Sequence, residues 1–151
     1  AYTAFTQGGC IKPMRLLLNQ EASSQCDQVM SAKTARQVLN MLETVTSDIG
    51  TGRRARVEGY RVGGKTGTAH KVGQQGYEDD EYTAVFAGVA PISDPDLVLV
   101  VVIDSPQGKE YYGGEVAAPV FSRIMEQSLR MRQVAPDDGK MPALQVAGGA
   151  Q

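Results

Sequence analysis

Three segments containing β-branched and aromatic residues follow one another along the chain, and their order constrains the fold most. They span residues 60–69, 82–90 and 97–104, and the last reads Leu-Val-Leu-Val-Val-Val-Ile-Asp. The polar residues 70–81, which include two glycines, are typical of a hairpin-type connection, and residues 91–95, with a proline at each end, predict a tight turn. Strands joined without a crossover helix pair antiparallel, so we expect an antiparallel meander.

Two segments outside the meander have the apolar spacing of amphipathic helices. Over residues 31–46 the apolar positions recur at helical spacing, and Ser31 is a suitable N-cap. A second helix is predicted near residues 115–132, where the apolar positions form one stripe. The expected fold class is α+β, an antiparallel sheet flanked by helices, over residues 1–135. Residues 136–151 are rich in Gly, Ala, Pro and Gln, which favours a flexible tail.

The composition argues against several classes of function. A formal net charge of -2 in 151 residues gives no electrostatic basis for binding nucleic acid. The longest apolar run, Leu97–Ile103, is far shorter than the ~20 residues that a membrane-spanning helix needs. The only histidine, His70, lies far along the chain from Cys10 and Cys26, so we predict no metal site and no cofactor. The two cysteines can pair in an oxidising compartment, but cysteines at arbitrary spacing are more often unpaired.

The most informative motif, Gly-Gly-Lys-Thr-Gly-Thr-Ala at residues 63–69, allows two incompatible interpretations. From Gly59 to Thr66 the chain fits the phosphate-binding pattern G-x-x-x-x-G-K-[ST], and the apolar run ending at Asp104 resembles a magnesium-holding strand of nucleotide hydrolases. A phosphate loop must follow a buried strand and open into a helix. The charged residues 53–58 argue against a buried strand upstream of the motif, and the glycines downstream argue against a helix there. We therefore keep a nucleotide-binding domain only as the alternative hypothesis.

As Lys-Thr-Gly-Thr on a strand, the same motif suits a substrate that carries a carboxylate. We expect Lys65 to point its charge into a cleft, and Thr66 and Thr68, two residues apart, to project on that same face. Hydroxyl groups donate hydrogen bonds to a carboxylate, and an ammonium group attracts it. Gly67 removes bulk on the opposite face, where another element can pack closely. The backbone amides of a strand edge can also serve as an oxyanion hole for acyl transfer.

Several segments, in this order along the chain, carry a resemblance to a known family. They are Gly59–Val62, Lys65–Ala69, Phe86–Pro91, Val100–Asp104 and Tyr112–Phe121. The first four resemble the transpeptidase domain of class B penicillin-binding proteins, and the last is similar to the branch that serves bacterial cell division, the penicillin-binding protein 3 type. The resemblance runs from residue 1 to about residue 138. It implies the C-terminal part of a domain like that of the serine β-lactamases and D,D-transpeptidases.

The resemblance implies a D,D-transpeptidase that cross-links peptidoglycan during septal cell-wall synthesis. In this family an active-site serine attacks the terminal D-Ala-D-Ala of a stem peptide, releases the last D-alanine, and passes the acyl group to an amine on a neighbouring stem peptide. β-Lactams mimic that dipeptide and leave a slow-to-hydrolyse acyl-enzyme. The implied partners are stem peptides, β-lactams and membrane proteins of the division complex. The implied location is the periplasmic face of the inner membrane, through an N-terminal anchor.

The resemblance also implies roles for individual residues. The residues expected to bind substrate or β-lactam are Thr66, Gly67, Thr68, Tyr112 and Gly113. The two threonine hydroxyls would bind the carboxylate, and the tyrosine would form an aromatic wall near the ligand. Lys65 would hold the electrostatic and proton network of the cleft. The backbone amide of Thr68 would be one oxyanion donor, and the glycine before it would permit the close approach.

Two motifs of the complete family pattern are absent from this chain. The nucleophile motif S-x-x-K has no counterpart, since residues 31–33 (Ser-Ala-Lys) are one residue too short. The motif S-x-N has none either, since residues 47–49 (Ser-Asp-Ile) end in the wrong residue. Without the serine and its lysine there is no activated nucleophile. We therefore expect a fragment that is inactive alone and that needs the N-terminal part of its own transpeptidase domain as a partner.

Overall fold

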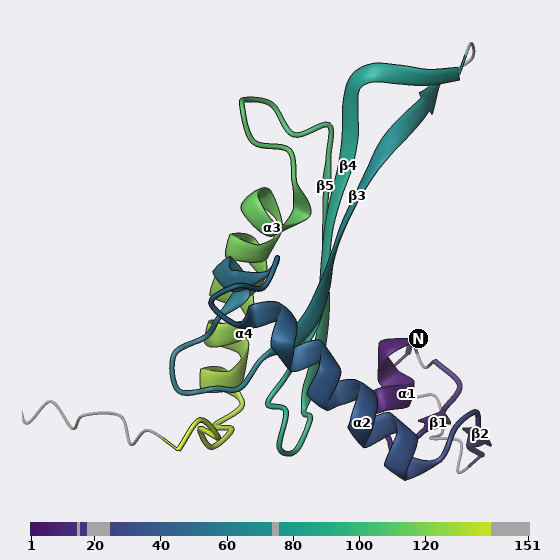
Figure 1. Cartoon of the computed structure of the whole chain (residues 1–151). Helices are drawn as coiled ribbons and strands as arrows, with labels where there is room; N and C mark the ends of the chain where they lie inside the picture. Colours follow the sequence, from purple (N-terminus) through teal and green to yellow (C-terminus); the bar gives the residue numbers. More distant parts are fainter. Residues whose placement is uncertain (15, 18–24, 74–75, 140–151) are drawn as a thin grey trace, which may run out of the picture.

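The computed structural model describes residues 1–14, 16–17, 25–73 and 76–139. A three-stranded sheet stands between helices that pack on both of its faces (Figure 1). The elements are, in chain order, α1 (Tyr2–Thr6), β1 (Cys10–Ile11), β2 (Asp27–Gln28), α2 (Ala32–Glu43), the 3-10 helices η1 (Thr44–Thr46) and η2 (Arg53–Ala55), β3 (Gly63–Gly73), β4 (Gly76–Ala90), β5 (Leu97–Asp104), α3 (Gly113–Val116) and α4 (Ala118–Met131).

The predicted antiparallel meander is confirmed. β3 pairs with β4 and β4 pairs with β5, both antiparallel, so the order in the sheet is β3-β4-β5. In this register Lys65 lies opposite Ala87, and Phe86 lies opposite Val101. β5 has the bounds that its apolar run predicted. A run of β-branched residues suits a pleated, half-buried surface, which is why this element is visible in the sequence.

The hairpin that joins β3 to β4 is longer than predicted. β3 ends at Gly73 and β4 begins at Gly76, so most of residues 70–81, expected to be a connection, belong to strands. The pairing shifts between His70 and Val72 and then continues to the end of β3. Because backbone groups make the ladder, a polar composition does not end it. Figure 1 shows this hairpin, in teal, extending beyond the helices.

Both predicted helices are present, and each differs from the prediction at one end. α2 begins after Ser31, whose hydroxyl accepts a hydrogen bond from the Thr34 amide at 3.0 Å, so the N-cap prediction is confirmed. Its last turn tightens into η1. The helix expected over 115–132 is divided into α3 and α4 at Ala117. Pro119 has no N–H to donate, so it occupies the first turn of a new helix.

The core lies on both faces of the sheet. On one face, Phe86 of β4 packs edge-on against Phe121 of α4, with ring centroids 4.7 Å apart. On the other face, Val89 of β4 packs with Leu39 of α2. Strand residues alternate between faces, so Phe86 and Val89 belong to opposite layers. Each fully buried side chain of this size stabilises the fold by ~1.5–3 kcal/mol, and the sheet is held between α2 and α4.

Cys10 and Cys26 form a disulfide, with their Cα atoms 5.8 Å apart. The expectation that such cysteines are unpaired is therefore wrong for this chain. β1 pairs with β2 so that Cys10 lies opposite Gln28, and Cys26 directly precedes β2. This pairing of short strands brings together two residues that are 16 positions apart, a contact that cysteine spacing by itself does not reveal.

The last described residues contact the body of the molecule. Asp137 accepts hydrogen bonds from the backbone amides of Arg61 at 2.6 Å and Ser93 at 3.0 Å. Residues 140–151 lie outside the described residues. The limit at residue 135 and the flexible tail over 136–151 therefore stay predictions.

Candidate carboxylate-binding pocket

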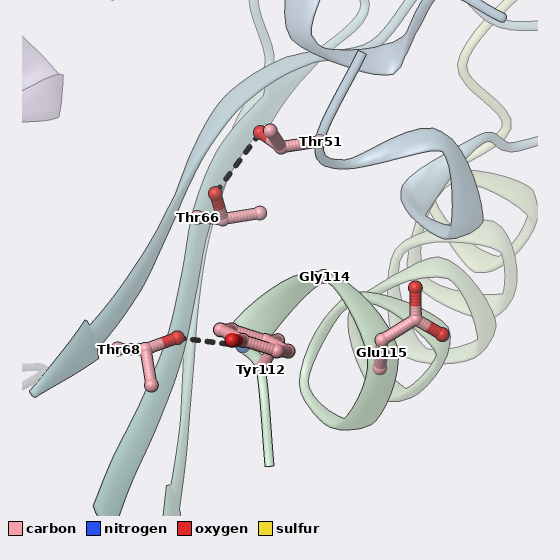
Figure 2. Close-up of a pocket in the computed structure, with 7 residues that line it drawn as sticks. Thr51, Thr66, Thr68, Tyr112, Gly114 and Glu115 are labelled. Carbon is pink, nitrogen blue, oxygen red and sulfur yellow. Dashed lines mark hydrogen bonds between the residues drawn. The ribbon is translucent and has the colours of Figure 1, made fainter. Parts of the chain in front are cut away.

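A pocket opens where β3, α3 and the loop before η2 meet (Figure 2). Its volume is about 270 Å³, close to the lower end of the ~300–1,000 Å³ that small-molecule sites occupy. The lining residues are Thr51, Thr66, Thr68, Tyr112, Gly113, Gly114 and Glu115. The structure thus brings together four of the predicted site residues, namely Thr66, Thr68, Tyr112 and Gly113. Lys65 and Gly67 lie on β3 but are not among the lining residues.

Thr68 is joined to the start of α3. Its Oγ1 accepts a hydrogen bond from the Gly113 N–H at 3.0 Å. A Cβ on Gly113 would lie 2.3 Å from the Val85 carbonyl oxygen and 2.5 Å from that of Gly67, so only glycine allows α3 to approach β3 this closely. Because the Thr68 hydroxyl accepts this bond, its own proton remains available to a group in the pocket.

Thr51 lines the pocket and was not predicted. Its Oγ1 lies 3.0 Å from Thr66 Oγ1, and Figure 2 shows the two hydroxyl groups facing each other. Its carbonyl oxygen lies against Gly114, where a Cβ would come within 2.1 Å of it. The glycines on both sides of Thr51 were the local signal of an unusual backbone. The sequence could not predict that its hydroxyl pairs with Thr66, since the loop and β3 meet only in the tertiary structure.

Glu115 joins α3 to η2. Its carboxylate pairs with the Arg54 guanidinium at 2.7 Å, and Arg54 also donates to the Glu115 carbonyl oxygen at 3.4 Å. A second, smaller pocket borders the first on this side and shares Thr51, Gly114 and Glu115 with it. η2 begins at Arg53, directly after the Thr51 loop. The ion pair therefore ties the wall that carries Thr51 to the wall that carries α3.

Lys65 lies on the opposite face of β3 from Thr66 and Thr68. Residues 63–70 pair continuously with β4, so their side chains alternate, and Lys65 shares its face with Gly67. The Lys65 Nζ donates to the Thr66 carbonyl oxygen at 2.8 Å, and the side chain is exposed. The expectation that one face would hold all three side chains was wrong, because adjacent residues of a strand point to opposite faces.

Tyr112 begins a row of aromatic rings that leads away from the pocket. Its ring centroid lies 4.4 Å from that of Tyr111, which stacks on Tyr82 at 4.1 Å, and Tyr82 lies 4.5 Å from His70. The hydrogen bond between the Tyr111 and Tyr112 hydroxyls, and the repulsion between two phenolates, raise the pKa of Tyr112. With 55% of its surface exposed, Tyr112 is accessible to a ligand. Tyr82 and Tyr111 were not predicted, since their stacking depends on tertiary contact.

The alternative interpretation, a phosphate loop, is not supported. Gly59 lies in a turn with φ of 84°, beside the bridge between Val57 and Tyr60. Lys65 and Thr66 lie inside β3, which is paired antiparallel with β4. A phosphate loop opens directly into a helix whose N-terminal amides face the phosphates, whereas here the strand continues beyond the motif.

Within the ranges that the structure describes, no group of three or more His, Cys, Asp or Glu side chains could hold a metal ion. In the same part of the chain, no helix has the length and apolar character needed to cross a membrane. The pocket instead offers threonine hydroxyls and an aromatic ring. Hydroxyl donors of this kind suit a carboxylate ligand.

Comparison with known sequences identifies relatives over most of the chain. The chain is 46% identical over 138 residues to the "Probable peptidoglycan D,D-transpeptidase PbpC" of Pseudomonas aeruginosa, covering 91% of this chain and 24% of that protein. It is 47% identical over 111 residues to the peptidoglycan D,D-transpeptidase FtsI of Escherichia coli, covering 74% of this chain and 19% of that protein. The chain thus spans about a quarter or less of the length of these curated relatives.

Solved structures and a family match agree with these relatives. The chain superimposes on the transpeptidase domain of Burkholderia pseudomallei penicillin-binding protein 3 with a TM-score of 0.78 and 41% identity, covering 93% of this chain and 42% of that one. The mixed arrangement of helices and antiparallel sheet is therefore that of a penicillin-binding transpeptidase domain, as predicted. Residues 1–126 match the penicillin binding protein transpeptidase domain family. The chain belongs to this family.

Proposed function

We propose that the chain is the C-terminal part of a D,D-transpeptidase domain that cross-links peptidoglycan stem peptides and is acylated by β-lactams. The observation that carries this proposal is the pair of β3 hydroxyls, Thr66 and Thr68, that line one pocket. Relatives named as peptidoglycan D,D-transpeptidases support it. The activity is that of the complete protein, because the nucleophile motif S-x-x-K is not in this sequence.

The proposed role of the pocket is to hold a carboxylate. The terminal D-alanine of a stem peptide and the bicyclic core of a penicillin both carry one. Thr68 keeps its proton for the ligand because its oxygen already accepts from Gly113. The hydroxyl pair of Thr66 and Thr51 shares one hydrogen bond and keeps one further proton. A hydrogen bond to a charged group is worth ~1.5–3 kcal/mol, so two such donors place the scissile bond firmly.

Lys65 and the backbone amide of Thr68 are the proposed catalytic groups of this chain. The serine oxygen of the complete protein would bond to the substrate carbonyl carbon, the amide C–N bond would break, and D-alanine would leave with a proton. β3 lies at the edge of the described sheet, and alternate N–H groups of an edge strand point away from the ladder. We assign the Thr68 N–H to the oxyanion, with Gly67 permitting close approach. The Lys65 ammonium would act on the proton network of the serine.

The remaining site residues and partners follow from the same proposal. Tyr112 would form an aromatic wall for the ligand beside Gly113. The N-terminal part of the transpeptidase domain would supply the serine, and an anchor further upstream would hold the protein at the periplasmic face of the inner membrane. Likeness to the penicillin-binding protein 3 type supports a role with the division complex during septum formation.

A fluorescent penicillin tests the proposal on the complete protein that contains this chain. We expect a covalent label that survives denaturing electrophoresis, and slower labelling when Thr66→Val and Thr68→Val are combined. Thr44→Val removes an exposed hydroxyl at the end of α2 and serves as the matched control. Absence of label on the complete protein would contradict the proposal. Label on the isolated chain would contradict the claim that the nucleophile lies outside it.

A further inference from the structure

We propose that Thr51 is a positioning residue of the carboxylate site, which acts through Thr66 by directing the proton of the Thr66 hydroxyl toward the ligand. This inference rests on the proposed function, since it concerns the same pocket. Its basis is the 3.0 Å contact between Thr51 Oγ1 and Thr66 Oγ1, two hydroxyls that line the same pocket from different segments (Figure 2).

The number of protons in this hydroxyl pair gives Thr51 its role. Each hydroxyl has one proton to donate and two lone pairs that accept. If Thr51 donates to Thr66, the proton of Thr66 is free for a carboxylate. If Thr66 donates to Thr51, its proton is consumed. A carboxylate bound at Thr66 favours the arrangement in which Thr51 donates to Thr66. In that chain of two hydrogen bonds, from Thr51 to Thr66 and from Thr66 to the carboxylate, each bond strengthens the other.

The neighbouring Thr68 completes this arrangement. Its oxygen accepts from the Gly113 N–H at 3.0 Å, so its proton also points to whatever enters the pocket. The Thr66 and Thr68 hydroxyls each accept one hydrogen bond and each have a proton left to donate. These two protons match the two oxygens of one carboxylate. Thr51 therefore does for Thr66 what the Gly113 amide does for Thr68.

The backbone around Thr51 holds the hydroxyl in place. The Gly52 amide donates to the Val45 carbonyl oxygen at 2.9 Å, and the Gly50 amide donates to Ser47 at 3.1 Å. The Thr51 carbonyl oxygen lies against Gly114, where no side chain fits. The ion pair between Arg54 and Glu115 ties the same loop to α3. A hydroxyl fixed in this way loses little further freedom when a ligand binds.

The test uses the complete protein and the second-order rate of acylation by a penicillin with a free carboxylate. Thr51→Val replaces the hydroxyl with a methyl group of similar size, and we expect a five- to tenfold lower rate. Thr51→Ser keeps the hydroxyl, and we expect it to restore most of the rate. With Thr66→Val already present, adding Thr51→Val should have little further effect, because the hydroxyl it acts through is gone.

The methyl ester of the same penicillin separates this role from a purely structural one. The ester should react more slowly than the free acid in every variant. Its own rate should be nearly the same in Thr51→Val as in the unsubstituted protein. The ratio of acid to ester rates does not depend on the fraction of folded protein, so it stays decisive if the variant is less stable. Should the valine variant not fold at all, Thr51→Ala is measured by the same ratio.

Three results would overturn the inference: an unchanged acid-to-ester ratio in Thr51→Val, no recovery in Thr51→Ser, or independent, multiplicative losses from Thr51→Val and Thr66→Val. A different result bears on the proposed function itself. If Thr66→Val and Thr68→Val together leave acylation by the free acid unchanged, the β3 hydroxyls do not hold the carboxylate. The two failures are therefore distinguishable.

Discussion

The two faces of β3 differ in what covers them. Thr66 and Thr68 face the Thr51 loop and the start of α3, and their hydroxyls form hydrogen bonds across these contacts. On the opposite face Lys65 is exposed, and a Cβ built on Gly67 would meet nothing closer than 3.6 Å in the described part of the chain. Around the motif, at residues 65–68, one face is packed by this chain itself and the other is open; at Gly63, nearer the start of β3, that second face packs against the end of α2.

This difference separates two roles within a single short motif. The Thr66 and Thr68 hydroxyls lie on the packed face, where contacts from the Thr51 loop and the start of α3 hold them in place. Lys65 lies on the open face, and in our proposal it acts on the serine that the N-terminal part of the domain would supply. Substitutions on the packed face should change stability and function together, and those on the open face should change function alone.

The largest effect is expected from Gly113→Ala. Its Cβ would press on the carbonyl oxygens of Val85 and Gly67 at 2.3 and 2.5 Å, and overpacking of this kind costs ~1–3 kcal/mol. The matched variant Gly67→Ala, on the open face, should cost less than ~1 kcal/mol. Urea unfolding of the complete protein measures both. Equal losses in the two variants would remove the distinction between the faces.

Thr68→Val comes next. It leaves the Gly113 N–H without its acceptor, and for this half-buried bond we expect a loss of about 1 kcal/mol. Acylation by a fluorescent penicillin should slow in the same variant. Thr68→Ser retains the oxygen and should recover both quantities. Thermal unfolding and labelling kinetics give the two readouts, and a variant that loses stability but labels at the normal rate would argue against a ligand role for this hydroxyl.

A smaller effect is expected from Arg54→Gln. The ion pair with Glu115 is about half exposed on the arginine side, with 51% of the Arg54 side chain accessible, and such pairs contribute ~0.2–1 kcal/mol. The loss should shrink as salt is raised, because salt screens exposed charges. Arg53→Gln, one residue earlier, is the matched control. Unfolding midpoints at low and high salt measure the effect, and a loss independent of salt would indicate packing instead of charge.

The smallest change in stability is expected from Lys65→Met. The side chain is exposed and its hydrogen bond goes to the adjacent Thr66 carbonyl oxygen, so stability should stay within ~0.5 kcal/mol. Acylation of the complete protein should nevertheless fall by about 10²-fold or more, as removal of a proton-transfer group does. Thermal unfolding of the isolated chain and labelling of the complete protein separate the two quantities. A large loss of stability with normal labelling would contradict the claim that Lys65 serves function and not stability.

Elements whose hydrogen bonds and burial depend on near neighbours were predicted well. The β5 run and the Ser31 N-cap appear where the sequence placed them. The motif starts at Lys65 on a strand, as the absence of a following helix pattern indicated. The shared face expected for Lys65 and the threonines was an error that strand alternation alone corrects. The length of the β3–β4 hairpin and the pairing of Cys10 with Cys26 depend on backbone pairing between segments, which composition does not encode.

The sequence by itself determined the antiparallel meander, the flanking helices, the family, and a strand motif whose hydroxyls at Thr66 and Thr68 we propose to bind a carboxylate. Only the tertiary structure decided which groups form hydrogen bonds with those hydroxyls. It brings Gly113 to Thr68 and Thr51 to Thr66, contacts between residues 45 and 15 positions apart. Periodicity and capping act over a few residues along the chain. A pocket requires distant segments packed to within hydrogen-bond distance, and the packing of α3 and the Thr51 loop on β3 provides that.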